Sequence, residues 1–188
     1  MSRHPSHAFA PVLVAVVFSA SVAMRATAQE AACTLDPIAL PLFDATPAAA
    51  IAATPHASTD VPELDEQGAA VAVSMLLACA GEEPQALRYA IYTDGYLARL
   101  FIGDTPADQP AFERMIATGA NIDAVAPTLE GIAGLEARED GRVAVTIEAT
   151  TVDGPIEDRL VLAWDARQEA WLIDEIVSLD PPPSSPTP

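Results

Sequence analysis

The sequence predicts an α+β domain in which N-terminal helices pack on a curved antiparallel β-meander. Two observations lead to this class. Apolar segments of helical length occupy the first half of the folded part, and the hydrophobic period changes to two in the second half. There, short connections containing Asp-Gly join consecutive apolar segments, and Asp-Gly is a strong hairpin signal. Helices followed by sequential antiparallel strands are typical of the α+β class.

Residues 1–28 have the layout of a cleavable secretory signal. Arg3 lies in a short polar start, an apolar run follows, and the small residues Ala26 to Ala28 precede the expected cleavage point. The apolar run is shorter than the roughly 20 residues of a membrane-spanning helix, and Pro11 interrupts it. Retention as an uncleaved N-terminal anchor is the alternative. We therefore predict a bacterial-type exported protein, secreted or extracytoplasmic, with no stable membrane span after cleavage.

The charge of the mature chain excludes several classes of partner. Cleavage leaves 160 of the 188 residues, a usual size for one domain. Arg3 and Arg25 leave with the signal, so seven arginines face 27 acids, and the formal charge becomes about −20. The chain has no lysine. Such a surface repels nucleic-acid phosphates and anionic lipid headgroups, so we expect no nucleic-acid partner and no membrane-surface partner.

The predicted domain, residues 63–180, lies between two proline-rich segments. Residues 29–62 form a Pro/Ala-rich lead-in whose five prolines exclude a long helix. We expect this lead-in to be extended and partly ordered, with the stretch 41–43 docking on the domain. Residues 181–188 form a Pro-rich tail of polyproline type.

Four apolar segments are predicted as helices: residues 67–81, 82–93, 94–103 and 109–119. The first is apolar on every side, which suits a helix buried on most faces. Gly81 and Gly119 are natural C-terminal stops. Pro84 is in position for a first helical turn, and Thr93 and Asp94 suit a helix cap.

Four later segments are predicted as strands: residues 128–139, 142–152, 157–165 and 170–179. Apolar and polar residues alternate along them, as expected of strands buried on one face. In the first strand, Gly131 and Gly134 indicate a bulge or a sharp bend. In the last strand, the alternation places Asp174 opposite Trp171 and Val177.

Cys33 and Cys79 are the only cysteines of the chain. In an oxidising compartment we expect an isolated pair to form a disulfide, which here would tie the mature N-terminus to the first helix. Two separate thiols are the alternative. A zinc site is disfavoured because two cysteines do not fill a tetrahedral shell. We predict no metal and no cofactor, since phosphate-loop and dinucleotide motifs are also absent from the sequence.

Two stretches resemble the NTF2-like superfamily, the cone-shaped α+β fold that includes SnoaL-type domains. They are CAGEEPQALRYAIYTDGYLARLF, which looks like that family's helix-turn-helix start, and GRVAVTIEATTVDGPIEDRLVLAWDARQEAWLIDEIV, which looks like its two-hairpin end. The resemblance implies a pocket between the helices and the concave sheet face. The family includes isomerases, dehydratases and cyclases as well as non-catalytic domains, so the fold does not fix the function.

Histidine chemistry is excluded from the predicted domain. His4 and His7 leave with the signal, and His56 lies in the lead-in. A histidine base and the Ser-His-Asp and Cys-His nucleophile schemes are therefore ruled out.

The remaining catalytic hypothesis uses carboxylates and tyrosines. Asp174 and Glu148 lie on otherwise apolar strands, and the hypothesis requires that either of them be half-buried with a raised pKa. Tyr92 and Tyr96, with Tyr89, would share one face of a continuous helix and supply hydroxyl donors. The alternative for each is structural: a buried ring with an exposed hydroxyl, or an acid that faces solvent.

Trp164 and Trp171 flank a turn in the last hairpin. Paired across it, they would close the core, which we favour, or stack on a ligand. Together with Tyr92 and Tyr96 they are the predicted ligand-binding residues. The function predicted is a secreted non-catalytic NTF2-like domain that binds a small apolar ligand or a partner protein. The alternative is a carboxylate- and tyrosine-based isomerase, lyase or cyclase, and a homodimer stays open.

Overall fold

The computed structural model describes residues 31–43, 46–53, 61–102, 105–119 and 125–179. Across these residues the elements are α1 (Pro47–Ala53), α2 (Glu66–Ala80), α3 (Gln85–Arg88), α4 (Asp94–Arg99), α5 (Gln109–Thr118), β1 (Thr128–Ala137), β2 (Val143–Thr151), β3 (Gly154–Asp165) and β4 (Ala170–Ser178). The strands form one antiparallel sheet in the order β1-β2-β3-β4. The predicted α+β class and the sequential meander are confirmed.

The chain ends carry predictions that the structure leaves open. The predicted signal, residues 1–28, and the tail, residues 181–188, lie outside the described residues, and so does His56. Within the described part of the chain, no helix has both the length and the apolar character that crossing a membrane requires.

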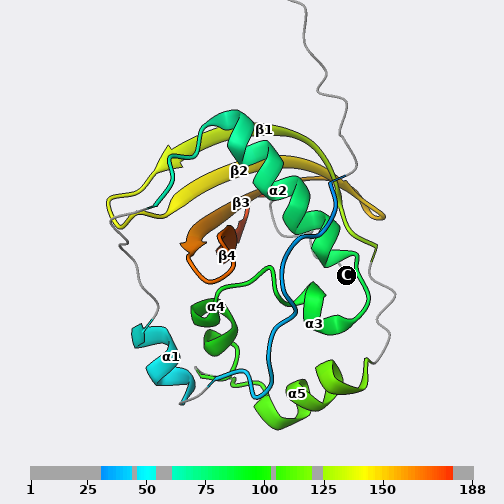
Figure 1. Ribbon diagram of the computed structural model, residues 1–188. Coiled ribbons are helices and arrows are strands. Elements are labelled where there is room, and N and C mark those ends of the chain that lie inside the picture. Colours follow the sequence, from blue (N-terminus) through cyan, green and yellow to red (C-terminus); the bar gives the residue numbers. More distant parts are fainter. Residues whose placement is uncertain (1–30, 44–45, 54–60, 103–104, 120–124, 180–188) are drawn as a thin grey trace, which may run out of the picture.

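The main core lies between α2 and one face of the sheet. The side chains of Val143, Val145, Ile147 and Ala149 alternate along β2 and are all buried, whereas Glu148 is exposed on the other face. They pack with the buried residues of α2, which are Ala69, Val73, Leu76 and Cys79. Figure 1 shows α2 lying across the arch of β1 and β2. Period-two burial on β2 is as the sequence predicts.

β1 contains two bulges, next to the glycines that predicted a bend. The pairing with β2 skips Glu130, between Leu129 and Gly131, and Ala133, between Ile132 and Gly134. An extra residue in one strand bends that strand and increases its twist. The bulges account for the curve of β1 over the sheet in Figure 1.

A further bulge lies in β4 and changes which residues face the core. Leu162 pairs with Ile173 and Val161 pairs with Glu175, so Asp174 is the extra residue. Beyond the bulge the alternation is shifted by one position. The expectation that Val177 shares a side with Trp171 is therefore wrong, and Val177 is 39% exposed.

The first predicted helix agrees with α2. The side chain of Asp65 caps its N-terminus by accepting a 2.7 Å hydrogen bond from the Gly68 N–H, and Gly81 is the C-cap. The last predicted helix agrees with α5, where Asp108 is the N-cap and Gly119 ends the helix in the left-handed conformation at φ 62°.

The second predicted helix is much shorter than expected. α3 has four residues, because the chain that follows it pairs with the edge of β4. The Ile173 N–H donates to the Ile91 carbonyl at 2.8 Å, and the Thr93 N–H donates to the Ile173 carbonyl at 3.0 Å. This pairing covers part of an otherwise open sheet edge.

The lead-in contributes to the folded unit. Its residues 41–43 dock as predicted, and Phe43 is buried in a second core with Leu97, Ala98 and Phe101 of the α4 region. The seven-residue helix α1 packs on the same cluster and was not expected. It begins at Pro47, where proline suits a first helical position. The prolines therefore exclude a long helix but allow a short one.

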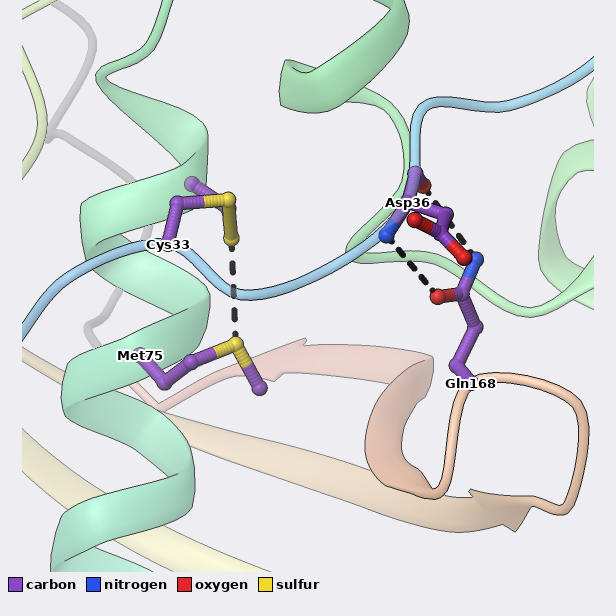
Figure 2. The surroundings of a disulfide bond; sticks show 5 residues. Cys33, Asp36, Met75 and Gln168 are labelled. Atoms are coloured by element: carbon purple, nitrogen blue, oxygen red, sulfur yellow. Dashed lines mark hydrogen bonds between the residues drawn. A yellow bond between two sulfur atoms is a disulfide. The ribbon is translucent and has the colours of Figure 1, made fainter.

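The predicted disulfide is present between Cys33 and Cys79. Figure 2 shows it joining the N-terminal segment, residues 31–43, to the C-terminal half of α2. Cys79 is fully buried. The Met75 sulfur lies 3.7 Å from Cys79 Sγ, a van der Waals contact because a disulfide sulfur has no proton to donate.

The disulfide generates a first prediction. Cys33→Ala/Cys79→Ala removes the bond without leaving a free thiol, and the cysteines are 46 positions apart. The chain-entropy relation gives a loss of up to about 4 kcal/mol in the free energy of unfolding. Urea unfolding followed by circular dichroism measures the change. An unchanged midpoint would show that α2 holds the N-terminal segment without the bond.

The two tryptophans, Trp164 and Trp171, generate a second prediction. Trp171 is 6% exposed in the main core, and its ring contacts Trp164 edge-on with centroids 5.8 Å apart. We expect Trp171→Ala to lower the free energy of unfolding by about 3–5 kcal/mol. Trp164→Ala is the matched comparison and should cost less, because Trp164 is only half-buried. A larger effect of Trp164 in urea melts would contradict the assignment of Trp171 as the core residue.

Candidate functional site: a pocket beside the N-terminal segment

A pocket of about 540 Å³ lies between the N-terminal segment, α1, α4 and the turn that joins β3 to β4. Apolar side chains make up most of its lining. The apolar residues are Pro37, Ile38, Ala39, Pro41, Leu42, Phe43, Ala49, Ala50, Ala90, Leu97 and Leu172. Tyr92, Gln168 and three charged residues complete it: Asp36, Asp94 and Arg167. Apolar walls with a few polar groups are typical of a small-molecule site.

Gln168 holds the N-terminal wall of the pocket in place. The Asp36 N–H donates to Gln168 Oε1 at 3.0 Å, and Gln168 Nε2 donates to the Asp36 carbonyl at 3.2 Å. Figure 2 shows this pair of hydrogen bonds between the turn and the segment that leaves the disulfide. Further along, the Ile38 N–H donates to the Ala86 carbonyl at 3.0 Å. The wall is thus fixed at the disulfide, at Gln168 and at Ala86.

The turn itself is ordered by Asp165. Its carboxylate accepts hydrogen bonds from the N–H groups of Arg167, at 2.8 Å, and Gln168, at 3.0 Å. Burial alone would raise the pKa of Asp165, but the hydrogen bonds and charge of Arg167 and the Gln168 N–H lower it overall. Asp165 is therefore ionised at neutral pH, and this local network presents Gln168 to Asp36.

Arg167 joins two carboxylates at the mouth of the pocket. Its Nη2 lies 3.0 Å from Asp94 Oδ2 and 3.0 Å from Asp165 Oδ2. The carboxylate of Asp36 has no such partner among the described residues. The lining contains two acids, Asp36 and Asp94, and one arginine, Arg167, so this end of the pocket has a net negative charge.

Tyr92 belongs to the lining, and its hydroxyl is neutral at neutral pH. Burial, followed by the neighbouring Tyr96 and Tyr89, raises the pKa of Tyr92 to about 12. At neutral pH it can donate a hydrogen bond but does not act as a base. Its ring stacks on Tyr96 with centroids 4.6 Å apart. The three tyrosines adjoin as predicted, although the chain between them is not one continuous helix.

Asp174 lies in a different environment from the one expected. Its side chain is fully buried, and it accepts hydrogen bonds from Thr93 Oγ1 at 2.7 Å and from Arg142 Nη1 at 2.8 Å. Arg99 Nη2 lies 3.4 Å from Asp174 Oδ1 and also donates to the Asp174 carbonyl. The same Thr93 hydroxyl accepts from the Tyr96 N–H at 3.0 Å and so caps α4.

The expected raised pKa of Asp174 is wrong. Burial would raise it, but the hydrogen bonds from Thr93 and Arg142 and the charges of Arg99 and Arg142 lower it overall. Both carboxylate oxygens are occupied, and Asp174 is not among the residues that line the pocket. The arrangement is that of a structural ion pair rather than of a base awaiting a proton.

The four residues predicted for catalysis are not brought together. Tyr92 lines the pocket, Tyr96 stacks behind it, Asp174 lies in its own network and Glu148 is exposed on β2. Among the described residues, no three or more His, Cys, Asp or Glu side chains form a group suited to a metal ion. Sequence reasoning missed Asp36, Arg167 and Gln168, whose roles depend on contacts between distant segments.

The two tryptophans line a second hollow, of about 550 Å³, between α2 and the β3–β4 turn. Val71, which is 64% exposed, and Met75 contribute from α2. Gln168 lies in the lining of both hollows. The tryptophans therefore combine a core role with a partly open edge, and they do not reach the pocket that Tyr92 lines.

Asp174→Asn generates a third prediction. It keeps the shape but removes the carboxylate that Arg99 and Arg142 share, while Arg142 keeps its ion pair with Asp140 at 2.6 Å. Breaking a buried ion pair costs about 3–5 kcal/mol, and because these arginines are 43% and 20% exposed we expect about 2–3 kcal/mol at pH 7. A lowered pKa stabilises the fold fully above the ordinary aspartate value of about 3.9 and less as the pH falls through the folded value. The difference in the free energy of unfolding between the wild type and Asp174→Asn should therefore become smaller as the pH falls.

The measurement is urea unfolding of both proteins at neutral and acidic pH. Glu148→Gln makes the same chemical change at an exposed site and should alter stability by no more than about 0.5 kcal/mol. A deficit that grows as the pH falls would contradict the ion-pair assignment of Asp174.

Comparisons of the chain with protein-family models, with curated proteins and with solved structures find no match. The NTF2-like resemblance therefore stays a prediction that rests on the order of the elements. The described residues show an α+β fold with a four-stranded antiparallel sheet and a largely apolar pocket beside it.

Proposed function

We propose that this protein is an exported, non-catalytic domain of the NTF2-like type that binds a small, largely apolar ligand. The pocket between the N-terminal segment and α4 is the binding site. The observation that carries the proposal is the lining of this pocket, which is mostly aliphatic or aromatic and includes the neutral Tyr92. A site of this volume and character suits a small organic molecule.

The geometry favours binding over the catalytic alternative. An isomerase, lyase or cyclase of the predicted kind needs a carboxylate that reaches the substrate. Asp174 instead has its oxygens occupied by Thr93, Arg142 and Arg99. Asp94, which does line the pocket, is paired with Arg167.

Export and the NTF2-like fold are supported by separate observations. A disulfide is consistent with an oxidising, extracytoplasmic location. For the NTF2-like fold, the support is the order of the elements, helices followed by a sequential antiparallel meander, which is compatible with the resemblance. These two parts of the proposal are independent of the ligand.

Pocket binding generates a fourth prediction. We expect N-phenyl-1-naphthylamine, a neutral apolar dye, to bind with a rise in fluorescence. Ala49→Trp places a large side chain in the lining and should weaken dye binding by about tenfold or more, because the added ring occupies the site.

Ala48→Trp is the matched control. Ala48 is exposed on the same helix, one residue earlier, but does not line the pocket, so dye binding should be unchanged. Both variants should show wild-type circular dichroism. Equal loss in the two variants, or no dye binding by the wild type, would contradict the proposed function.

A further inference from the structure

We propose that the ligand of this pocket is a small organic cation, an amine carried on an apolar body. This inference rests on the proposed function and specifies the chemical class of the ligand. It follows from the charges at the mouth of the pocket and from their arrangement relative to the apolar walls.

The charges at the mouth are unbalanced. The guanidinium of Arg167 contacts Asp94 and Asp165, each at 3.0 Å, so its charge is already shared by two carboxylates. Asp36 adds a further carboxylate that no described side chain pairs. The charged residues that line the pocket are Asp36, Asp94 and Arg167, whose charges sum to one negative unit, and one cation would neutralise it.

The position of Asp36 makes its carboxylate available. Its backbone N–H and carbonyl are the groups that bind Gln168, so the chain is fixed there without use of the side chain. The residue is exposed at the edge of the lining, while Ile38 and Leu42 are half-buried within it. An apolar body would contact these two side chains, and its ammonium group would lie toward Asp36.

The net charge of the whole chain also favours a cationic ligand. The formal net charge is −18, so the long-range field attracts cations and repels anions. An anionic ligand that approached Arg167 would lie beside Asp94 and Asp165, whose carboxylates already share its charge at 3.0 Å each and would repel a further anion. A neutral ligand would gain from the apolar walls alone.

The experiment compares three ligands with one hydrocarbon body: 1-naphthylmethylamine, 1-naphthylmethanol and 1-naphthaleneacetic acid. Binding to the full exported chain is measured by calorimetry at low ionic strength. We expect the amine to bind about two- to fivefold more tightly than the alcohol, and the acid to bind most weakly. The advantage of the amine should fall in 1 M NaCl, because salt screens exposed charges.

Asp36→Asn tests the assigned carboxylate. Its Gln168 hydrogen bonds use the backbone and should persist, so the variant should fold normally. We expect amine affinity to fall about threefold, while alcohol affinity stays unchanged. Asp153→Asn removes the same charge from the exposed β2–β3 turn, outside the pocket lining, and should change neither affinity.

Each remaining outcome overturns a defined statement. If the alcohol binds as tightly as the amine, the ligand is not a cation, although the pocket still binds apolar molecules. If Asp36→Asn leaves amine affinity unchanged, Asp36 is not the carboxylate that binds the amine, and the proposed arrangement is wrong. If Asp153→Asn lowers the affinity for the amine as much as Asp36→Asn does, the preference for the amine comes from the net charge of the chain and not from Asp36. If neither the three ligands nor the neutral dye binds, the proposed function itself is wrong.

Discussion

The buried carboxylate of Asp174 is the interaction on which the arrangement of helices against the sheet depends. It accepts from Thr93 at the start of α4 and from Arg142 next to the start of β2, and it lies 3.4 Å from Arg99 at the end of α4. Burying one charge is expensive unless it is paired and hydrogen-bonded. The three partners therefore have to be brought together for the fold to form, and this fixes α4 at the edge of β4.

The bulge in β4 makes this possible. Asp174 is the residue that has no partner in β3, so its position is released from the regular alternation of the strand. The neighbouring Ile173 meanwhile pairs with the chain before α4 through its own N–H and carbonyl. The backbone pairing of Ile173 and the ion pairs of Asp174 thus act on adjacent residues, and both hold β4 against the start of α4, a contact called the α4–β4 junction below.

The pocket forms where the N-terminal segment packs against the α4–β4 junction. Tyr92 and Leu97 come from the chain next to the Thr93 cap, and Leu172 comes from β4 just before the bulge. The disulfide and Gln168 then hold residues 33–36 against these elements. In Figure 1 the blue N-terminal segment passes α2 and α3 on its way to α5 and α1. A pocket closed in this way opens at a charged rim and has an apolar interior, which suits binding.

The sequence by itself determined the class, the order of the elements and the local ends of several helices. Alternation predicted β2 and Gly119 predicted the end of α5, because these signals are carried by residues close in sequence. The disulfide could be predicted because the chain has two cysteines, so each has one possible partner in the chain. Only the tertiary structure decided the β4 bulge and showed that Asp174, a candidate base in the catalytic alternative, is a buried ion-pair partner. It also decided that Asp36 and Gln168, 132 positions apart, meet at one pocket. The reason is physical. A bulge and a long-range hydrogen bond gain their free energy from partners elsewhere in the fold, and the local hydrophobic period of the sequence does not depend on those partners.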